Sequence, residues 1–141
     1  IGKSNIRFLP EEITNLMILR TLSLFDCGFE HIPDHIMQIP NLSSLYVTGC
    51  QIQDIPQKFG ELDNIQWITF RDNMISNIPR GVLCTREIMG LSLDANRLSE
   101  FNFTIEDFPK LKFLSLEDNM FSDSVRASII EEFGSIDVLE I

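Results

Sequence analysis

LRTLSLFDCGF, residues 19–29, is the first of five segments that share one pattern of apolar residues. The other four are LSSLYVTGCQI (42–52), IQWITFRDNMI (65–75), IMGLSLDANRL (88–98) and LKFLSLEDNMF (111–121). Successive segments start 23 residues apart. A fixed period of this length predicts a stack of structural repeats, each of which buries its apolar side against its neighbours.

Within each segment, positions 1, 4, 6 and 11 are apolar, and the alternation around positions 4 and 6 is that of a strand with one buried face. Position 9 is either Cys or Asn. A side chain at this position is expected to turn inward and to bind the backbone of the adjoining loop. The residues at position 9 are Cys27, Cys50, Asn73, Asn96 and Asn119.

After each strand, the chain is expected to return through a loop, a 3₁₀ turn or a single helical turn. The motifs IPDHI, IPQKF and IPRGV begin three of these return segments, at residues 32, 55 and 78. Proline lacks an N–H and has a fixed φ, so it suits such a turn better than the interior of a strand. In the fourth return segment, Asn102 stands in place of the proline, and Phe103 is a candidate for an exposed side chain.

The fifth return segment, FSDSVRASIIEEFGS (121–135), is two residues longer and is predicted to form a true helix. Ser122 or Asp123 can cap its N-terminus, and Gly134 can end it. Four apolar residues are expected to share its buried face: Val125, Ile129, Ile130 and Phe133. Residues 136–141 then restart the strand pattern, which predicts a sixth strand.

The pattern LxxLxLxxNxL, followed by a proline-bearing return segment, resembles the leucine-rich repeat, and the resemblance covers essentially the whole chain. The 23-residue form is similar to repeats in Ras-suppressor-like and Scribble-like scaffolds, in bacterial effectors and in plant immune receptors. This resemblance implies an α/β solenoid, a right-handed superhelix in the shape of a horseshoe arc. A parallel β-sheet would line its concave side, with loops, 3₁₀ turns and short helices on its convex side.

We expect a single domain of 141 residues, made of one partial repeat, five full repeats and the start of another. Their boundaries are 1–18, then 19–41, 42–64, 65–87, 88–110 and 111–135, then 136–141. The family usually protects its ends with capping modules, and none is visible in this sequence. No signal peptide is visible either, and the chain starts in mid-pattern. We therefore expect it to be part of a longer protein.

The chain is acidic, with 21 Asp and Glu residues against 11 Lys and Arg residues and a formal charge of -10. An acidic surface repels nucleic-acid phosphates and anionic membranes, so we expect neither as a partner. No apolar run approaches the roughly 18 to 20 residues of a membrane span. Acidity also favours solubility by itself.

Three cysteines, Cys27, Cys50 and Cys84, give no even disulfide framework. Cys27 and Cys50 hold the same place in successive repeats, so their Cβ directions should be parallel, which does not suit a disulfide. We expect all three to be buried or half-buried thiols. This favours a reducing compartment and a cytoplasmic location, with secretion or delivery into a host as the alternative.

The sequence offers little for catalysis, metal binding or cofactor binding. His31 and His35 are the only histidines, but Pro33 lies between them and no third metal ligand is near, so we expect solvated loop side chains. A serine or cysteine nucleophile would have to take its base from that same loop. The tripeptide GKS at residues 2–4 lacks the upstream glycine and strand of a phosphate-binding loop. We predict no catalytic residue, no metal and no cofactor.

The informative surface is the concave face of the sheet, where positions 3, 5 and 7 of each repeat should point. The only tryptophan and the only tyrosine, Trp67 and Tyr46, fall there on neighbouring strands. With strands about 4.8 Å apart, these two can form one patch with Phe25 and Arg71, and Gly90 leaves space beside the indole. Trp, Tyr and Arg often dominate the energetics of interfaces. The candidate partner-binding residues are Phe25, Tyr46, Thr48, Trp67, Thr69, Arg71, Asp94, Phe113 and Glu117.

The same face becomes acidic towards its C-terminal half. The carboxylates expected there are Asp72, Asp94, Glu117, Asp118, Asp137 and Glu140. An aromatic patch with an acidic flank suits a partner that carries an exposed apolar segment followed by Lys or Arg. Exposed aromatic residues also serve simply to cover a sheet, and a row of charges is often just a solvated face.

We therefore predict a non-catalytic protein–protein interaction module that binds a protein or peptide on its concave sheet. Two alternatives remain open. One is the substrate-targeting arm of a larger enzyme, a ligase or kinase, whose catalytic domain lies outside these residues. The other is an extracellular receptor ectodomain, which is compatible with the glycosylation sequons that begin at Asn41 and Asn102.

Overall fold

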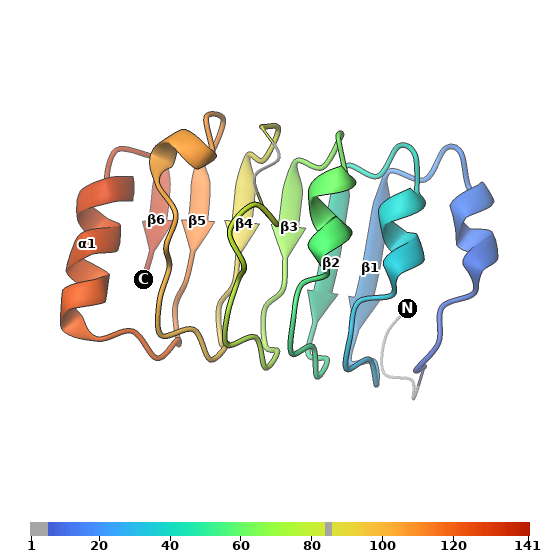
Figure 1. Ribbon diagram of the computed structural model, residues 1–141, viewed down its shortest axis with the longest axis horizontal. Coiled ribbons are helices and arrows are strands. Elements are labelled where there is room, and N and C mark those ends of the chain that lie inside the picture. The colour runs from blue at the N-terminus through green and yellow to red at the C-terminus, as the bar shows by residue number, and fades with distance from the viewer. Residues whose placement is uncertain (1–5, 84–85) are drawn as a thin grey trace.

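Six parallel strands form one sheet in which each strand lies beside its sequence neighbour (Figure 1). The structure is a computed structural model that describes residues 6–83 and 86–141, so the expectations for residues 2–4 and Cys84 lie outside the described residues. The strands are β1 (Thr21–Phe25), β2 (Ser44–Thr48), β3 (Trp67–Thr69), β4 (Gly90–Ser92), β5 (Phe113–Ser115) and β6 (Val138–Glu140). This architecture is the predicted leucine-rich-repeat solenoid.

The register of the sheet brings equivalent positions of successive repeats side by side. On the inner face, one row of paired residues runs Leu22, Leu45, Ile68, Leu91, Leu114 and Leu139. The first five of these are at most 6% exposed. Each repeat therefore buries its strand leucine or isoleucine against the same residue of its neighbours, which is the main source of stability in a stack of this kind.

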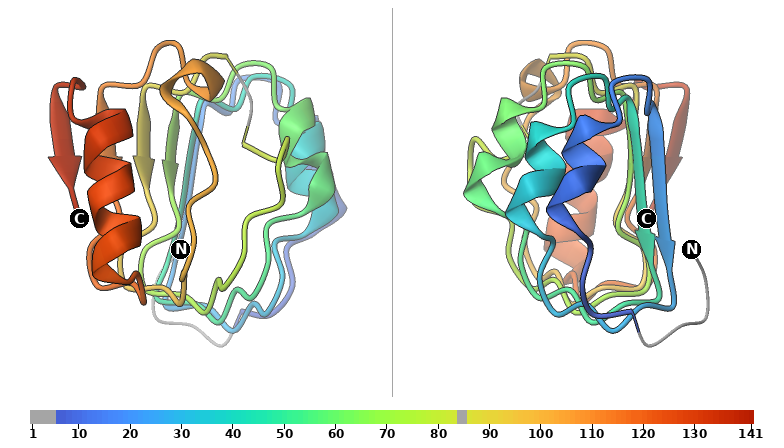
Figure 2. Two further views of the ribbon diagram at one scale, coloured as in Figure 1. Left: turned by 60° about the vertical axis from the view of Figure 1, so that its left-hand side comes forward. Right: turned by 90° about the vertical axis from the view of Figure 1, so that its right-hand side faces the viewer.

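The return segments form a second layer on the opposite side of the core from the sheet (Figure 2). Four of them contain 3₁₀ helices: η1 (Glu11–Asn15), η2 (Asp34–Gln38), η3 (Gln57–Glu61) and η4 (Ile105–Asp107). Pro10, Pro33 and Pro56 stand immediately before the first three, with φ values of -66°, -60° and -60°. These are the angles that the proline ring imposes, so each proline favours the turn that follows it, as predicted for Pro33 and Pro56. Ile36 and Phe59 fill the core beneath it.

The predicted fifth return helix is α1, Asp123–Phe133 (Figure 1). Of the two candidate caps, Ser122 is the one used, because its side chain accepts a hydrogen bond from the Val125 N–H at 3.3 Å. Ile129 and Phe133 are buried, but Ile130 is 51% exposed, so its expected place on the buried face was wrong. The buried side chains are spaced by four, and Ile130 lies about 100° round the helix from Ile129.

Phe103 is also placed differently from the prediction, because it is buried rather than exposed. Its ring centroid lies 5.0 Å from that of Phe101 and 5.4 Å from that of Phe108. Phe133 of α1 packs edge-on against Phe101 at 5.7 Å. The fourth return segment thus replaces the proline turn with aromatic packing against the longer helix that follows it.

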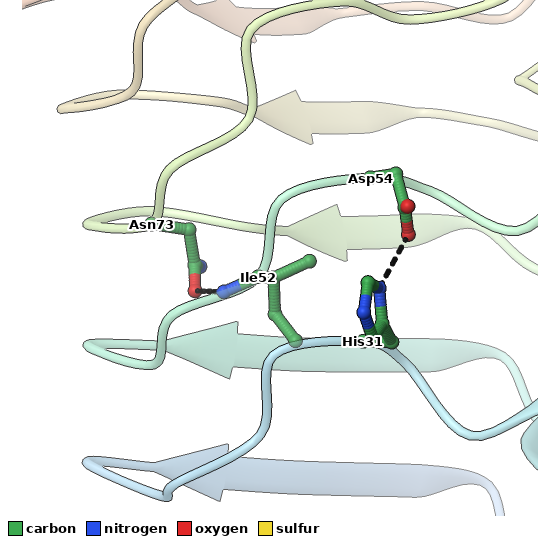
Figure 3. A network of polar contacts seen from close by, with 4 residues as sticks. All are labelled: His31, Ile52, Asp54 and Asn73. Atoms are coloured by element: carbon green, nitrogen blue, oxygen red, sulfur yellow. Dashed lines mark hydrogen bonds and ion pairs between the residues drawn. The ribbon is translucent and has the colours of Figure 1, made fainter.

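The predicted asparagine ladder is present at Asn73 (Figure 3). Its Oδ1 accepts the Ile52 N–H at 3.2 Å, and its Nδ2 donates to the carbonyl oxygens of Val47 at 2.8 Å and Phe70 at 3.0 Å. Asn96 and Asn119 make equivalent bonds one and two repeats later. Each asparagine therefore joins the turn of its own repeat to the loop of the preceding one.

Cys27 and Cys50 reproduce only part of this ladder. Both are buried free thiols, as predicted. Their Sγ atoms donate to the carbonyl oxygens of Phe25 at 3.3 Å and Thr48 at 3.6 Å. A thiol has no amide oxygen, so neither cysteine offers the acceptor that the asparagines give to the preceding repeat.

The N-terminal end of the described solenoid carries exposed apolar side chains. Phe8 is 71% exposed, and Met17 and Ile18 are exposed too.

In the part of the chain that the structure describes, no helix is long and apolar enough to cross a membrane.

Candidate functional site

The candidate site is the outer sheet face, which we define as the side of the six-stranded sheet that points away from the core. Burial alternates along β1 and β2, so the predicted residues of these strands do lie on this face. Phe25, Trp67, Arg71 and Glu117 are exposed. Tyr46, Thr48, Thr69 and Phe113 are half-buried, and Asp94 alone is buried.

Trp67 lies over the neighbouring strand β4 rather than standing free. Its indole covers Gly90, because a Cβ added at Gly90 would overlap the ring atoms Cε3 and Cζ3. Gly90 is buried as a result, although it belongs to the outer sheet face, and Trp67 itself remains 40% exposed. We predicted that Gly90 leaves space beside the indole, and in the structure the indole itself occupies that space.

The direction in which the Trp67 indole points determines which side chains of the outer sheet face lie near it. Trp67 is paired in the sheet with Ser44 of β2 on one side and Gly90 of β4 on the other. The ring leans towards β4, whose next partner in the same row is Phe113 of β5. Among the ring contacts of the described residues, none joins Trp67 to Tyr46. No ring contact in the described residues joins Trp67 to Phe113 either, so the indole points towards the C-terminal half of the face without stacking on another ring.

Asp94 anchors a buried polar network just beyond β4. One carboxylate oxygen accepts a hydrogen bond from the Ser92 Oγ at 2.9 Å. The other accepts from the Ser115 Oγ and from the Glu117 N–H, the latter at 3.0 Å. Asp94 is only 6% exposed. It ties β4 to the chain following β5 and holds a negative charge at a fixed place on the outer sheet face.

The remaining charges of the face are exposed and unpaired. Ion pairs within the described residues join His31 to Asp54, Lys58 to Asp34 and Lys110 to Glu87, all away from this face. Glu117 and Glu140 face solvent, as does Arg71. Asp72 and Asp118 stand in left-handed turns after their strands, with φ of 55° and 54°. The C-terminal half of the face is thus acidic, and its exposed carboxylates are available to a partner.

The two histidines do not converge on a common ligand position. His31 is exposed, as predicted, and its Nδ1 lies 3.2 Å from an oxygen of Asp54 (Figure 3). His35 differs from the prediction because it is half-buried, and its Nε2 is buried without a hydrogen-bond partner. In the described part of the chain, no group of three His, Cys, Asp or Glu side chains is arranged to hold a metal ion.

Among the residues that the structure describes, the thiol of Cys50, away from the face, has a shifted pKa. Burial raises the pKa of the Cys50 thiol above the ordinary value of 9.0. The thiol therefore stays protonated at neutral pH, and it packs as a small apolar side chain.

A groove of about 460 Å³ lies away from the outer sheet face, between α1 and residues 100–104. Several of its polar side chains are used by the fold. Glu132 accepts the Ile105 N–H at 2.8 Å, and the Ser128 Oγ donates to the Ser124 carbonyl at 3.1 Å. We therefore place the candidate site on the outer sheet face rather than in this groove, because large exposed aromatic side chains occur on that face.

Sequence reasoning missed two residues that shape the site, Ser92 and Ser115. Both lie on the outer sheet face in one paired row, and both hold the Asp94 carboxylate. The available signal was a pair of hydroxyl side chains at position 5 of neighbouring repeats, beside an aspartate at position 7.

No protein-family model and no curated protein matches the sequence. Among solved structures, the chain is similar to the leucine-rich-repeat protein LIC12759 of Leptospira interrogans, with a TM-score of 0.88 and 23% identity. It is similar to the leucine-rich-repeat domain of the type III effector XopL, with a TM-score of 0.74 and 21% identity. It is also similar to an internalin C2 from Listeria monocytogenes, with a TM-score of 0.72 and 21% identity.

The aligned regions cover 97%, 84% and 92% of this chain, in the same order, but only 35%, 43% and 54% of those chains. This chain therefore spans about a third to about half of the length of the proteins it resembles. At these identities the similarity establishes the leucine-rich-repeat fold.

Proposed function

We propose that this chain is a non-catalytic protein-binding module, and that its partner, a protein or peptide, lies on the outer sheet face. The observation that supports this most is the exposed indole of Trp67 in the middle of that face. Positions 3, 5 and 7 of the repeat supply no side chain to the apolar core of the described residues, so the fold does not require a large aromatic residue at any of them.

The aromatic residues of the face have the properties of interface anchors. Phe25 of β1 and Trp67 of β3 are each about two-fifths exposed. Tyr46 is half-buried and belongs to β2, the strand between them. Such side chains offer a large apolar area with few rotatable bonds, so a partner that covers them gains free energy at a low entropic cost. Truncation of an aromatic anchor typically costs about 2 kcal/mol or more of binding free energy.

The charges of the face favour a partner with apolar and basic segments. Glu117 and Glu140 are exposed and unpaired, while Asp94 adds a buried negative charge beside them. An apolar segment of the partner would cover the aromatic residues, and its Lys or Arg side chains would meet the carboxylates. Electrostatic attraction of this kind raises the association rate and lowers affinity for acidic competitors.

The test begins with a phage-displayed library of random peptides, selected on the wild-type protein. Binding of a selected peptide is then compared between the wild type and the double variant Trp67→Ala/Tyr46→Ala. We expect the double variant to lose at least about 30-fold in affinity, which corresponds to about 2 kcal/mol. The matched control is Phe8→Ala, which removes an exposed aromatic side chain that belongs to no strand of the sheet.

A double variant that keeps its affinity within about twofold would refute binding on the outer sheet face, provided that its unfolding midpoint is unchanged. An equal loss in Phe8→Ala and in the double variant would point to non-specific binding of apolar surface. A library that yields no binder would contradict the proposed function itself.

We also infer a reducing compartment for the chain. The support is that Cys27 and Cys50 are free and buried in adjacent repeats. Protein from its native source should show free thiols at both positions when it is unfolded in the presence of an alkylating reagent. A disulfide or a glycan at Asn41 or Asn102 would contradict this location.

A further inference from the structure

We propose that Gly90 seats the Trp67 indole as a flat platform that receives a positively charged side chain, arginine or lysine, of the partner. This inference rests on the proposed function and names the chemistry that the centre of the outer sheet face recognises.

The first step is the role of Gly90. The two residues paired with Trp67 are Ser44 and Gly90, and only Gly90 lacks a Cβ. The benzene half of the indole occupies the place where a side chain at position 90 would begin. A glycine at this one position therefore lets the ring lie on β4, while Trp67 as a whole remains 40% exposed. The ring is fixed before a partner arrives, which lowers the entropic cost of binding.

The second step is the electrostatic setting of the platform. Asp94 follows Gly90 by four residues on the same face. At the usual rise per residue of a strand, the Cα atoms of the two residues are roughly 13 Å apart. The charge of Asp94 is fixed by hydrogen bonds from two hydroxyl groups and one backbone N–H. Glu117, beyond the end of β5, and Glu140 of β6 add exposed carboxylates. Arg71, four residues after Trp67, is an exposed base on the same face, and these three carboxylates outnumber it. The protein as a whole carries a formal charge of -10.

An indole in a negative surrounding is a suitable receptor for a cation. The face of the ring attracts a guanidinium or ammonium group within about 6 Å of its centre, and tryptophan does so more strongly than the other aromatic residues. The long apolar stem of Arg or Lys can lie along the ring while its charged end points towards the carboxylates. A partner side chain that is only apolar would gain nothing from those carboxylates.

If Trp67 and Gly90 served only to stabilise the sheet, the experiment would give a different result. A cross-strand aromatic residue that covers a glycine stabilises a sheet, and this alone would explain the contact. Such a role predicts that a substitution at Gly90 changes stability without changing which ligands bind. The experiment therefore measures charge selectivity at the indole as well as stability.

Trp67 is the only tryptophan, so the fluorescence of the wild-type protein reports on this site alone. Each quenching constant is divided by that of free N-acetyltryptophanamide at the same ionic strength, because caesium is the weaker quencher of a free indole. We expect this normalised constant to be at least about twofold larger for caesium than for iodide, because the local potential attracts cations. In Gly90→Ala we expect a red-shifted emission and about twofold stronger quenching by neutral acrylamide, because the ring is lifted from β4. Ser44→Ala, on the other side of the ring, should leave all three quenching constants unchanged.

The second measurement uses a peptide selected from the random library on the wild-type protein. Each basic residue of the peptide is replaced in turn by citrulline, which keeps the shape of arginine but not its charge. We expect one replacement to lower the affinity for the wild type about tenfold. The same replacement should lower the affinity for Gly90→Ala by less than about threefold, because the platform is already lost.

Three results would overturn the inference. They are a normalised iodide constant as large as the normalised caesium constant in the wild type, a peptide whose affinity survives every citrulline replacement, and unchanged acrylamide quenching in Gly90→Ala. The first two need only the wild-type protein, so they stand even if Gly90→Ala does not fold. Loss of binding in Trp67→Ala/Tyr46→Ala together with citrulline tolerance would leave the proposed function intact and refute only the cation platform.

Discussion

Two rows of paired residues run across the same sheet, one on each face. The inner row, Leu22, Leu45, Ile68, Leu91 and Leu114, contains only leucine and isoleucine. The outer row, one residue earlier on each strand, contains Thr21, Ser44, Trp67, Gly90 and Phe113. No two of these outer residues are the same.

The inner row is uniform because each side chain packs against its copy in the next repeat, and close packing tolerates little change of volume. The outer row has solvent on one side and is free of this constraint. Its largest side chain, Trp67, and its smallest residue, Gly90, are nonetheless neighbours, and the Trp67 indole lies over Gly90. The comparison indicates that the inner face carries the stability of the fold, and it is in keeping with the proposal that the outer face binds the partner.

The largest effect on stability should come from the inner face. Leu91→Ala should lower the free energy of unfolding by about 3 kcal/mol, since it removes a fully buried side chain and leaves a cavity. Thr69→Ala, on the outer face of the adjacent strand, should change it by less than about 0.5 kcal/mol. Urea unfolding followed by circular dichroism measures both. Equal losses would remove the distinction between the faces.

Much of the inner face is predictable from the sequence, because the spacing of the leucines fixes both the strands and their register. The proline turns are predictable as well, since φ of proline is set locally. The lean of the Trp67 indole and the burial of Phe103 are not, because each depends on side chains of another repeat. The same is true of the hydrogen bonds to Asp94, whose donors come from two strands and the chain that follows them.

The turn ladder should show the next largest effect. Asn96→Ala should cost about 2 kcal/mol or more, because it leaves buried backbone groups of two repeats without their hydrogen bonds. Cys50→Ala, at the same position of an earlier repeat, should cost only about 1 kcal/mol, because a thiol makes only weak hydrogen bonds. Denaturant unfolding of the two variants compares them directly, and a reversed order would contradict the assigned roles.

The polar network around Asp94 on the outer face should contribute less to the free energy of unfolding than the Leu91 side chain or the Asn96 hydrogen bonds. Asp94→Ala should lower the free energy of unfolding by about 1 to 2 kcal/mol, because the Ser115 hydroxyl and the Glu117 N–H lose their acceptor. The same variant should reduce the excess of caesium over iodide quenching at Trp67. Unchanged stability together with unchanged quenching would show that Asp94 is neither an anchor nor a source of potential.

The smallest effect concerns the Cys50 thiol. Because burial raises its pKa in the folded state, the folded protein holds this proton more tightly than the unfolded chain does. The resulting stabilisation is complete below the thiol pKa of the unfolded chain and is lost as pH rises through the higher pKa of the folded state. The stability of the wild type relative to Cys50→Ala should therefore fall at alkaline pH. A relative stability that rises with pH would contradict this assignment.

The most direct test of the proposed function is hydroxyl-radical footprinting of the protein with and without a selected peptide, read out by mass spectrometry. The proposed function predicts that the peptide protects Trp67, Tyr46 and Phe25 from oxidation. The exposed side chains away from the face, Phe8, Met17 and Met120, should stay as reactive as in the free protein. Protection of Phe8, Met17 or Met120 with no protection of Trp67 and Tyr46 would contradict it.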